Sequence, residues 1–254
     1  YDFGVVMVFL IVLASQIFLD KKKIYYLAIL LFSLFAMLLS QSKTALFIFI
    51  FCFLYGISLS VILNRNVKIF LQLVISACVL ILTAIFFYED IYLLWVDNFI
   101  YMDRAFDIER VIRKSFQTGN RLYDLLWVLE RYQNANLLNW FFGLGIGKGI
   151  YDDIEFGYAI YLYRYGIVGL FMYISILISV YIISLKSLII SRTLKLNHYK
   201  NLFYSFHIWS FGLIIGTLAN NFIDQPRITF LYFSLFGLSL GFMISIAKSK
   251  LLNY

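Results

Sequence analysis

Residues 158–185 read YAIYLYRYGIVGLFMYISILISVYIISL, twenty-eight residues with a single charged side chain, Arg164. A helix needs about 20 predominantly apolar residues to cross the roughly 30 Å hydrocarbon core of a bilayer. A stretch of this length and composition therefore predicts a membrane-spanning helix.

Comparable apolar runs precede and follow this stretch. The whole chain is 63% hydrophobic and 14% charged and holds one proline, far more apolar than soluble globular domains normally are. We therefore predict an all-α fold, a polytopic transmembrane bundle of about seven spans. The other six are expected at 3–19, 24–40, 44–63, 67–88, 203–223 and 228–247.

The short connections between these runs differ in charge. Eleven Lys and Arg residues fall on one side of the predicted bundle and two on the other, which is the positive-inside pattern. The pattern places Tyr1 outside and the C-terminus in the cytoplasm. We expect spans one to four in 1–88, a large extracytoplasmic loop in 89–157, and spans five to seven in 158–254. Because the chain enters an apolar run at once without a signal peptide, we also expect further spans upstream.

The net charge of +7 could indicate a nucleic-acid partner. Its basic residues, however, sit between apolar runs or in the long loop, so we interpret them as topology signals and expect no nucleic acid. Cys52 and Cys78 both fall inside apolar runs, where cysteine usually behaves as a small hydrophobe. We expect no cofactor and no metal.

The long loop contains two predicted amphipathic helices. Residues 103–114 place apolar side chains on one face, and 121–133 carry Leu122, Leu125, Leu126 and Leu129 at helical spacing. Asn120 is a candidate N-cap for the second helix. We expect both helices to lie at the outer membrane interface or to pack over the mouth of the bundle.

A glycine-rich stretch and an acidic cluster follow in residues 140–155. The glycine backbone and the Lys148 ammonium suit an anion, although a loose turn explains the glycines equally well. Asp152, Asp153 and Glu155 could hold a divalent cation or provide a general base. They could also mark the membrane boundary, and the sequence leaves both pairs of alternatives open.

Three basic residues lie where a predicted span meets the outer face: Lys43, Arg164 and Arg227. Charges at membrane depth are costly, so such residues are either functional or extend toward the headgroups. His207 lies inside a predicted span, where we expect a neighbouring helix to satisfy it.

Four degenerate motifs occur in a set order. A serine-rich segment with a basic residue occupies 40–44, an arginine heads a tryptophan-containing helix at 121–127, and glycines recur in 143–147. Glu155 then precedes an l-x-x-y-G-x-x-G segment at 162–169. In this order the chain resembles the C-terminal half of the O-antigen polymerase and O-antigen ligase family of bacterial envelope glycosyltransferases.

The resemblance implies a multi-pass protein of the bacterial cytoplasmic (inner) membrane. Its donor would be an undecaprenyl-diphosphate-linked oligosaccharide, polymerised at the outer face into O-antigen, capsular or exopolysaccharide. It also implies that Arg121, with Lys43, Lys148, Arg164 and Arg227, binds the diphosphate or glycan.

By the same resemblance, Glu155 or Asp153 would act as base. An acidic group in place of the ligase histidine favours polymerase over ligase, whereas Lys43 stands where the family has arginine and lacks its bidentate fork. A chain-length regulator is a further candidate partner. A ligase, a transporter or flippase of lipid-linked sugars, and a scaffold remain alternatives.

Overall fold

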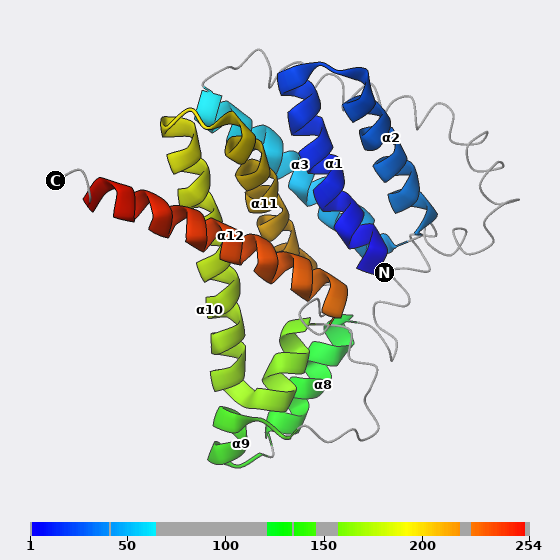
Figure 1. The fold of residues 1–254 in the computed structure, drawn as a ribbon. Helices are drawn as coiled ribbons and strands as arrows, with labels where there is room; N and C mark the ends of the chain where they lie inside the picture. The colour runs from blue at the N-terminus through cyan, green and yellow to red at the C-terminus, as the bar shows by residue number, and fades with distance from the viewer. Residues whose placement is uncertain are drawn as a thin grey trace, which may run out of the picture. The chain divides into compact units, whose positions relative to one another are not determined.

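The computed structural model describes residues 2–40, 42–64, 121–133, 135–145, 157–218 and 225–251, and within these ranges every regular element is a helix (Figure 1). They are α1 (Asp2–Lys21), α2 (Ile24–Leu39), α3 (Lys43–Asn64), α8 (Arg121–Gln133), α9 (Leu137–Phe142), α10 (Gly157–Thr193), α11 (Asn197–Gly216) and α12 (Pro226–Leu251).

The chain divides into two compact units. The first comprises residues 1–52 and 119–254, and the second comprises 53–118, of which the structure describes the last part of α3. The helices α1, α2 and α8 to α12, with the start of α3, belong to the first unit.

Four of the described helices are long and apolar enough to cross a membrane: Phe3–Lys21, Thr44–Leu63, Gly157–Thr193 and Pro226–Ser249. A shorter apolar helix covers Ile24–Met37. The predicted all-helical fold is therefore confirmed for the described residues, and these include four candidate membrane-spanning helices. The expected span at 67–88 and the expected helix at 103–114 lie outside the described residues, so seven spans and an extracytoplasmic loop stay predictions.

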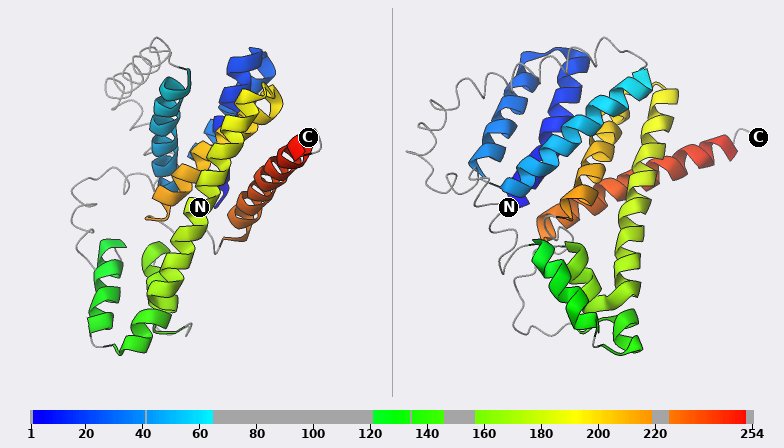
Figure 2. Two further views of the ribbon diagram at one scale, coloured as in Figure 1. Left: turned by 90° about the vertical axis from the view of Figure 1, so that its left-hand side faces the viewer. Right: turned by 180° about the vertical axis from the view of Figure 1, so that it is seen from behind.

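The α11 helix is absent from these four because polar residues recur along it, and its packing explains how a membrane bundle accommodates them. Residues 203–210 include four aromatic residues, a histidine and two serines. Within 203–213 every residue except Phe211 is buried. The helix packs against α1, α10 and α12, and the two views of Figure 2 show it running beside α10. A helix that faces other helices need not be apolar all round.

The predicted span at 158–185 is not one continuous helix. Gly166 has φ 67° and ψ −164°, so α10 turns back on itself there (Figure 1). We call residues 157–165 the short limb and 167–193 the long limb. The rings of Tyr161 and Tyr173 stack at 3.9 Å, which places the limbs side by side. The long limb alone, at about 1.5 Å per residue, measures roughly 40 Å and can cross a bilayer.

Hydrogen bonds made by buried serine hydroxyls, one to a histidine ring and one to a backbone carbonyl, join the long limb to α11 and α12. His207 Nδ1 lies 2.9 Å from the Ser184 hydroxyl, and Ser187 Oγ donates to the carbonyl of Ser239 at 3.3 Å. We call Ser184, Ser187, His207 and Ser239 the polar seam. The expectation that a neighbouring helix satisfies His207 is confirmed.

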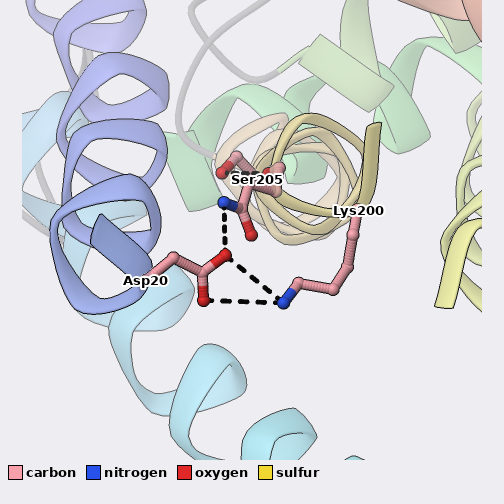
Figure 3. A network of polar contacts seen from close by, with 4 residues as sticks. Asp20, Lys200 and Ser205 are labelled. Atoms are coloured by element: carbon pink, nitrogen blue, oxygen red, sulfur yellow. Dashed lines mark hydrogen bonds and ion pairs between the residues drawn. The ribbon is translucent and has the colours of Figure 1, made fainter. Parts of the chain in front are cut away.

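A second polar contact joins the end of α1 to the start of α11 (Figure 3). The Asp20 carboxylate accepts a hydrogen bond from Asn201 Nδ2 at 2.7 Å and pairs with Lys200 Nζ at 3.3 Å. Because Lys200 and Asp20 are partly exposed, this ion pair contributes at most about 1 kcal/mol. Its main effect is to fix which ends of the two helices lie together.

Candidate functional site

The residues singled out in the sequence fall into three groups in the structure. Lys148, Asp153 and Glu155 lie outside the described residues. Lys43 and Arg121 are the first residues of α3 and α8, and the structure describes their helices and not their side chains. Arg164 is half-buried on the short limb, and Arg227 is exposed at the start of α12.

Around Arg164, the short limb packs with α8 and α9 into what we call the hairpin layer. Its core consists of four buried side chains, Val128 and Tyr132 from α8 with Ala159 and Leu162 from the short limb. The hydrophobic effect therefore joins two segments about thirty residues apart in the sequence.

The predicted helix at 121–133 is confirmed with the same bounds, and two of the four leucines that marked it lie outside the core of the hairpin layer. Leu126 is 57% exposed and Leu129 38% exposed, whereas Val128 and Tyr132 are fully buried. The residues that α8 buries lie on a different side of the helix from Leu126 and Leu129, because that side contacts the short limb. The spacing of leucines within α8 cannot indicate where the short limb packs.

The short limb ends in an unusual way. A helix that ends leaves the carbonyls of its last turn short of intrahelical donors. Here Tyr132 Oη donates to the Leu162 carbonyl at 2.6 Å, and the Leu144 amide donates to the Tyr163 carbonyl at 2.8 Å. Burial raises the pKa of Tyr132, which keeps this phenol protonated as a donor. Residues from α8 and from the chain after α9 thus cap the short limb.

Two glycines allow the backbones of α9 and the short limb to cross. A Cβ on Gly143 would lie 2.2 Å from the Arg164 carbonyl oxygen, and one on Gly166 would lie 2.4 Å from the Phe141 carbonyl oxygen. Both glycines also have positive φ, 90° and 67°. No other residue fits either position without displacing backbone, so glycine is required twice at what we call the glycine crossing.

Aromatic contacts complete the layer. The Trp127 ring lies 5.5 Å from the Tyr163 ring, and the Arg131 guanidinium lies 5.0 Å above Trp127. Trp140 of α9 packs on Tyr132 at 4.8 Å. The tryptophan-containing helix, the glycine stretch and the 162–169 segment, which the sequence marks separately, therefore pack together. The serine-rich segment at 40–44 has no such contact in the described parts of the chain.

Sequence reasoning missed a group of hydroxyls beside the hairpin. Tyr158 Oη donates to the Ile214 carbonyl at 2.8 Å, the Tyr173 and Thr217 hydroxyls lie 3.2 Å apart, and the Gly157 amide donates to the Thr217 carbonyl at 3.1 Å. These contacts fasten the start of the short limb to the end of α11. The recurrence of tyrosine at 158, 161, 163 and 165 was the signal in the sequence.

Within the described ranges, no three His, Cys, Asp or Glu residues are grouped so that they could hold a metal ion. The described side chains of the hairpin layer include the cations Arg131 and Arg164, aromatic rings such as Trp127, and the hydroxyl of Tyr132. Comparisons of this chain with protein-family models, with curated proteins and with solved structures find no match.

Proposed function

We propose that this membrane protein polymerises lipid-diphosphate-linked oligosaccharide repeat units at the outer face of the bacterial cytoplasmic membrane. The observation that supports the proposal most is the packing of the hairpin layer. Three of the four motifs behind the family resemblance, at 121–127, 143–147 and 162–169, contribute residues to one small core or to its glycine crossing.

The reaction sets the chemical requirements. An acceptor sugar hydroxyl attacks the anomeric carbon of the donor, the bond from that carbon to the diphosphate oxygen breaks, and the lipid diphosphate leaves with the electron pair. The leaving group gains negative charge and the attacking hydroxyl loses its proton, so the site must provide cations and a base.

The proposed roles follow from these requirements. Arg121, Lys43 and Arg164 would stabilise the departing diphosphate, because charge-assisted hydrogen bonds to phosphate oxygens are the strong ones. Lys148 and Arg227 would contact the diphosphate or the glycan. Glu155 or Asp153 would take the proton from the acceptor hydroxyl.

The test is chain growth in a purified system. Protein in lipid nanodiscs is supplied with a polyprenyl-diphosphate-linked repeat unit, and products are separated by length. Arg121→Ala and Glu155→Gln should each lower the rate by about a hundredfold or more, the usual cost of losing a charge-stabilising or acid–base group. Arg192→Ala, at the other end of α10, and Glu130→Gln, exposed on α8, are the matched controls.

The outcomes separate the proposal from its alternatives. Normal chain growth in both Arg121→Ala and Glu155→Gln would show that the site is wrong. Transfer of one unit to a lipid A acceptor without polymerisation would indicate a ligase. Movement of the lipid-linked unit across the bilayer without any glycosidic bond would indicate a flippase.

A further inference from the structure

The α9 helix exposes a face of large apolar side chains. Leu137 is 75% exposed, Leu138 67%, Phe141 47% and Phe142 66%. At 100° per residue these four positions fall within an arc of about 140° on one side of the helix. Trp140 lies on the opposite side, where it packs against Tyr132 in the hairpin layer. Both sides of the helix therefore carry large apolar side chains, and protein covers only the side that holds Trp140.

This face adjoins the exposed apolar surface of a candidate membrane-spanning helix. The end of α9 lies against Gly166, and the long limb of the membrane-spanning α10 starts at the next residue. Ile167, Val168, Phe171 and Met172, the first exposed apolar residues of that limb, are between 39% and 70% exposed. The exposed apolar surface of the span thus begins at the turn on which α9 rests.

The distribution of charge separates α9 from α8. The sequence of α9, LLNWFF, has no charged residue. On α8 the exposed positions include Glu130, Arg131 and Gln133 beside Leu126 and Leu129. A helix with charges on its exposed face stays in the headgroup region, whereas an exposed face of leucine and phenylalanine enters the acyl boundary. If this apolar patch faced water instead of lipid, it would favour association with another protein surface.

We propose that α9 is an interfacial membrane anchor, whose Leu137, Leu138, Phe141 and Phe142 face inserts at the headgroup–acyl boundary of the bilayer that the long limb crosses. Insertion replaces water around four large apolar side chains without requiring charge to be buried. It holds the glycine crossing, and with it Arg164, at the membrane surface. The inference requires no catalytic activity and stands apart from the proposed function.

Fluorophore depth measurements test the anchor. Leu138→Cys and Phe142→Cys are made separately in a Cys78→Ala background, in which Cys52 is buried and escapes labelling under native conditions. Each variant is labelled with an environment-sensitive dye and placed in nanodiscs. The lipids carry a nitroxide either near the headgroup or near the end of the acyl chain. Gln133→Cys on α8 is the polar control and Met172→Cys on the long limb the lipid-facing control.

The anchor predicts quenching at 138 and 142 by lipid-borne nitroxide, close to that at 172 and well above that at 133. The shallow nitroxide should quench more than the deep one, because such helices insert about 5–10 Å into the boundary. A dye at 138 and 142 that only a water-soluble nitroxide quenches would overturn the proposal. A blue-shifted dye that neither nitroxide reaches would also overturn it, since protein, such as a second copy of the chain, would then cover α9.

Discussion

The hairpin layer and the polar seam solve the same problem, joining helices that meet away from water, by opposite means. The seam uses side-chain hydrogen bonds such as that between Ser184 and His207, and its helices keep ordinary helical geometry. The layer uses backbone crossing at Gly143 and Gly166, where the chain adopts conformations that side chains resist. The seam can therefore lose a contact and keep its shape, whereas the layer depends on two positions that allow no substitution.

The largest expected effect is that of Gly166→Ala. Its φ and ψ lie in a region that is essentially restricted to glycine, and the added Cβ would meet the Phe141 carbonyl. We expect a loss of at least about 3 kcal/mol, comparable to the most disruptive point substitutions. Thermal unfolding in detergent, together with faster proteolysis after α9, measures it. Gly237→Ala on α12, where a Cβ meets open space, is the control and should be neutral or slightly stabilising. Equal melting temperatures for Gly166→Ala and Gly237→Ala would show that the glycine crossing does not require glycine at 166.

An intermediate effect is expected for Tyr132→Phe, which removes the hydroxyl that caps the Leu162 carbonyl. A lost hydrogen bond of this kind costs about 1 kcal/mol. Folding raises the pKa of Tyr132 above the unfolded value of about 10. Above that pH the unfolded chain loses the phenol proton while the folded chain keeps it, so deprotonation favours the unfolded state. Wild-type stability should therefore fall as pH rises through that range.

The pH dependence distinguishes this hydroxyl from others. Part of the alkaline loss of stability should be missing in Tyr132→Phe and retained in Tyr199→Phe, whose tyrosine is exposed on α11. Melting temperatures at neutral and alkaline pH provide the comparison. If the melting temperature fell equally with alkaline pH in Tyr132→Phe and in the wild type, Tyr132 would not be the group responsible.

The smallest effect belongs to the polar seam. Ser184→Ala removes the hydroxyl beside His207 Nδ1, and interhelical hydrogen bonds in membrane proteins contribute on average about 0.6 kcal/mol, with a maximum of about 1.7. Ser179→Ala, exposed on the same limb, is the matched control. If Ser184→Ala proved as damaging as Gly166→Ala, the seam would be as intolerant as the layer and the contrast between them would fail.

Several helices could be predicted from the sequence because their causes are local. The bounds of α1, α2, α3 and α8 lie within two residues of the predicted segments, since apolar run length and flanking charge determine them. The hairpin at Gly166 was not predicted. A glycine inside an apolar run resembles any small residue of a span, and its positive φ is fixed by Phe141 and Gly143, which precede it by more than twenty residues.

The candidate site was predictable as a set of segments and not as a geometry. The sequence singled out Arg164 and the glycine stretch, and the structure packs them together at the crossing. The cap that Tyr132 places on the short limb could not be predicted from the sequence, because a hydrogen bond between residues thirty apart depends on tertiary packing. The side chains of Lys43 and Arg121, and all of Lys148, Asp153 and Glu155, lie outside what the structure describes, so their roles stay predictions.

The glycine crossing also limits how this protein can change through mutation. Most packing defects can be rescued by making a neighbour smaller, but each glycine here faces backbone atoms, which no substitution can shrink. Gly143 and Gly166 therefore cannot compensate for one another. A selection for restored function after losing either one should return true revertants, or insertions and deletions that change the path between α9 and α10, and no paired point substitutions.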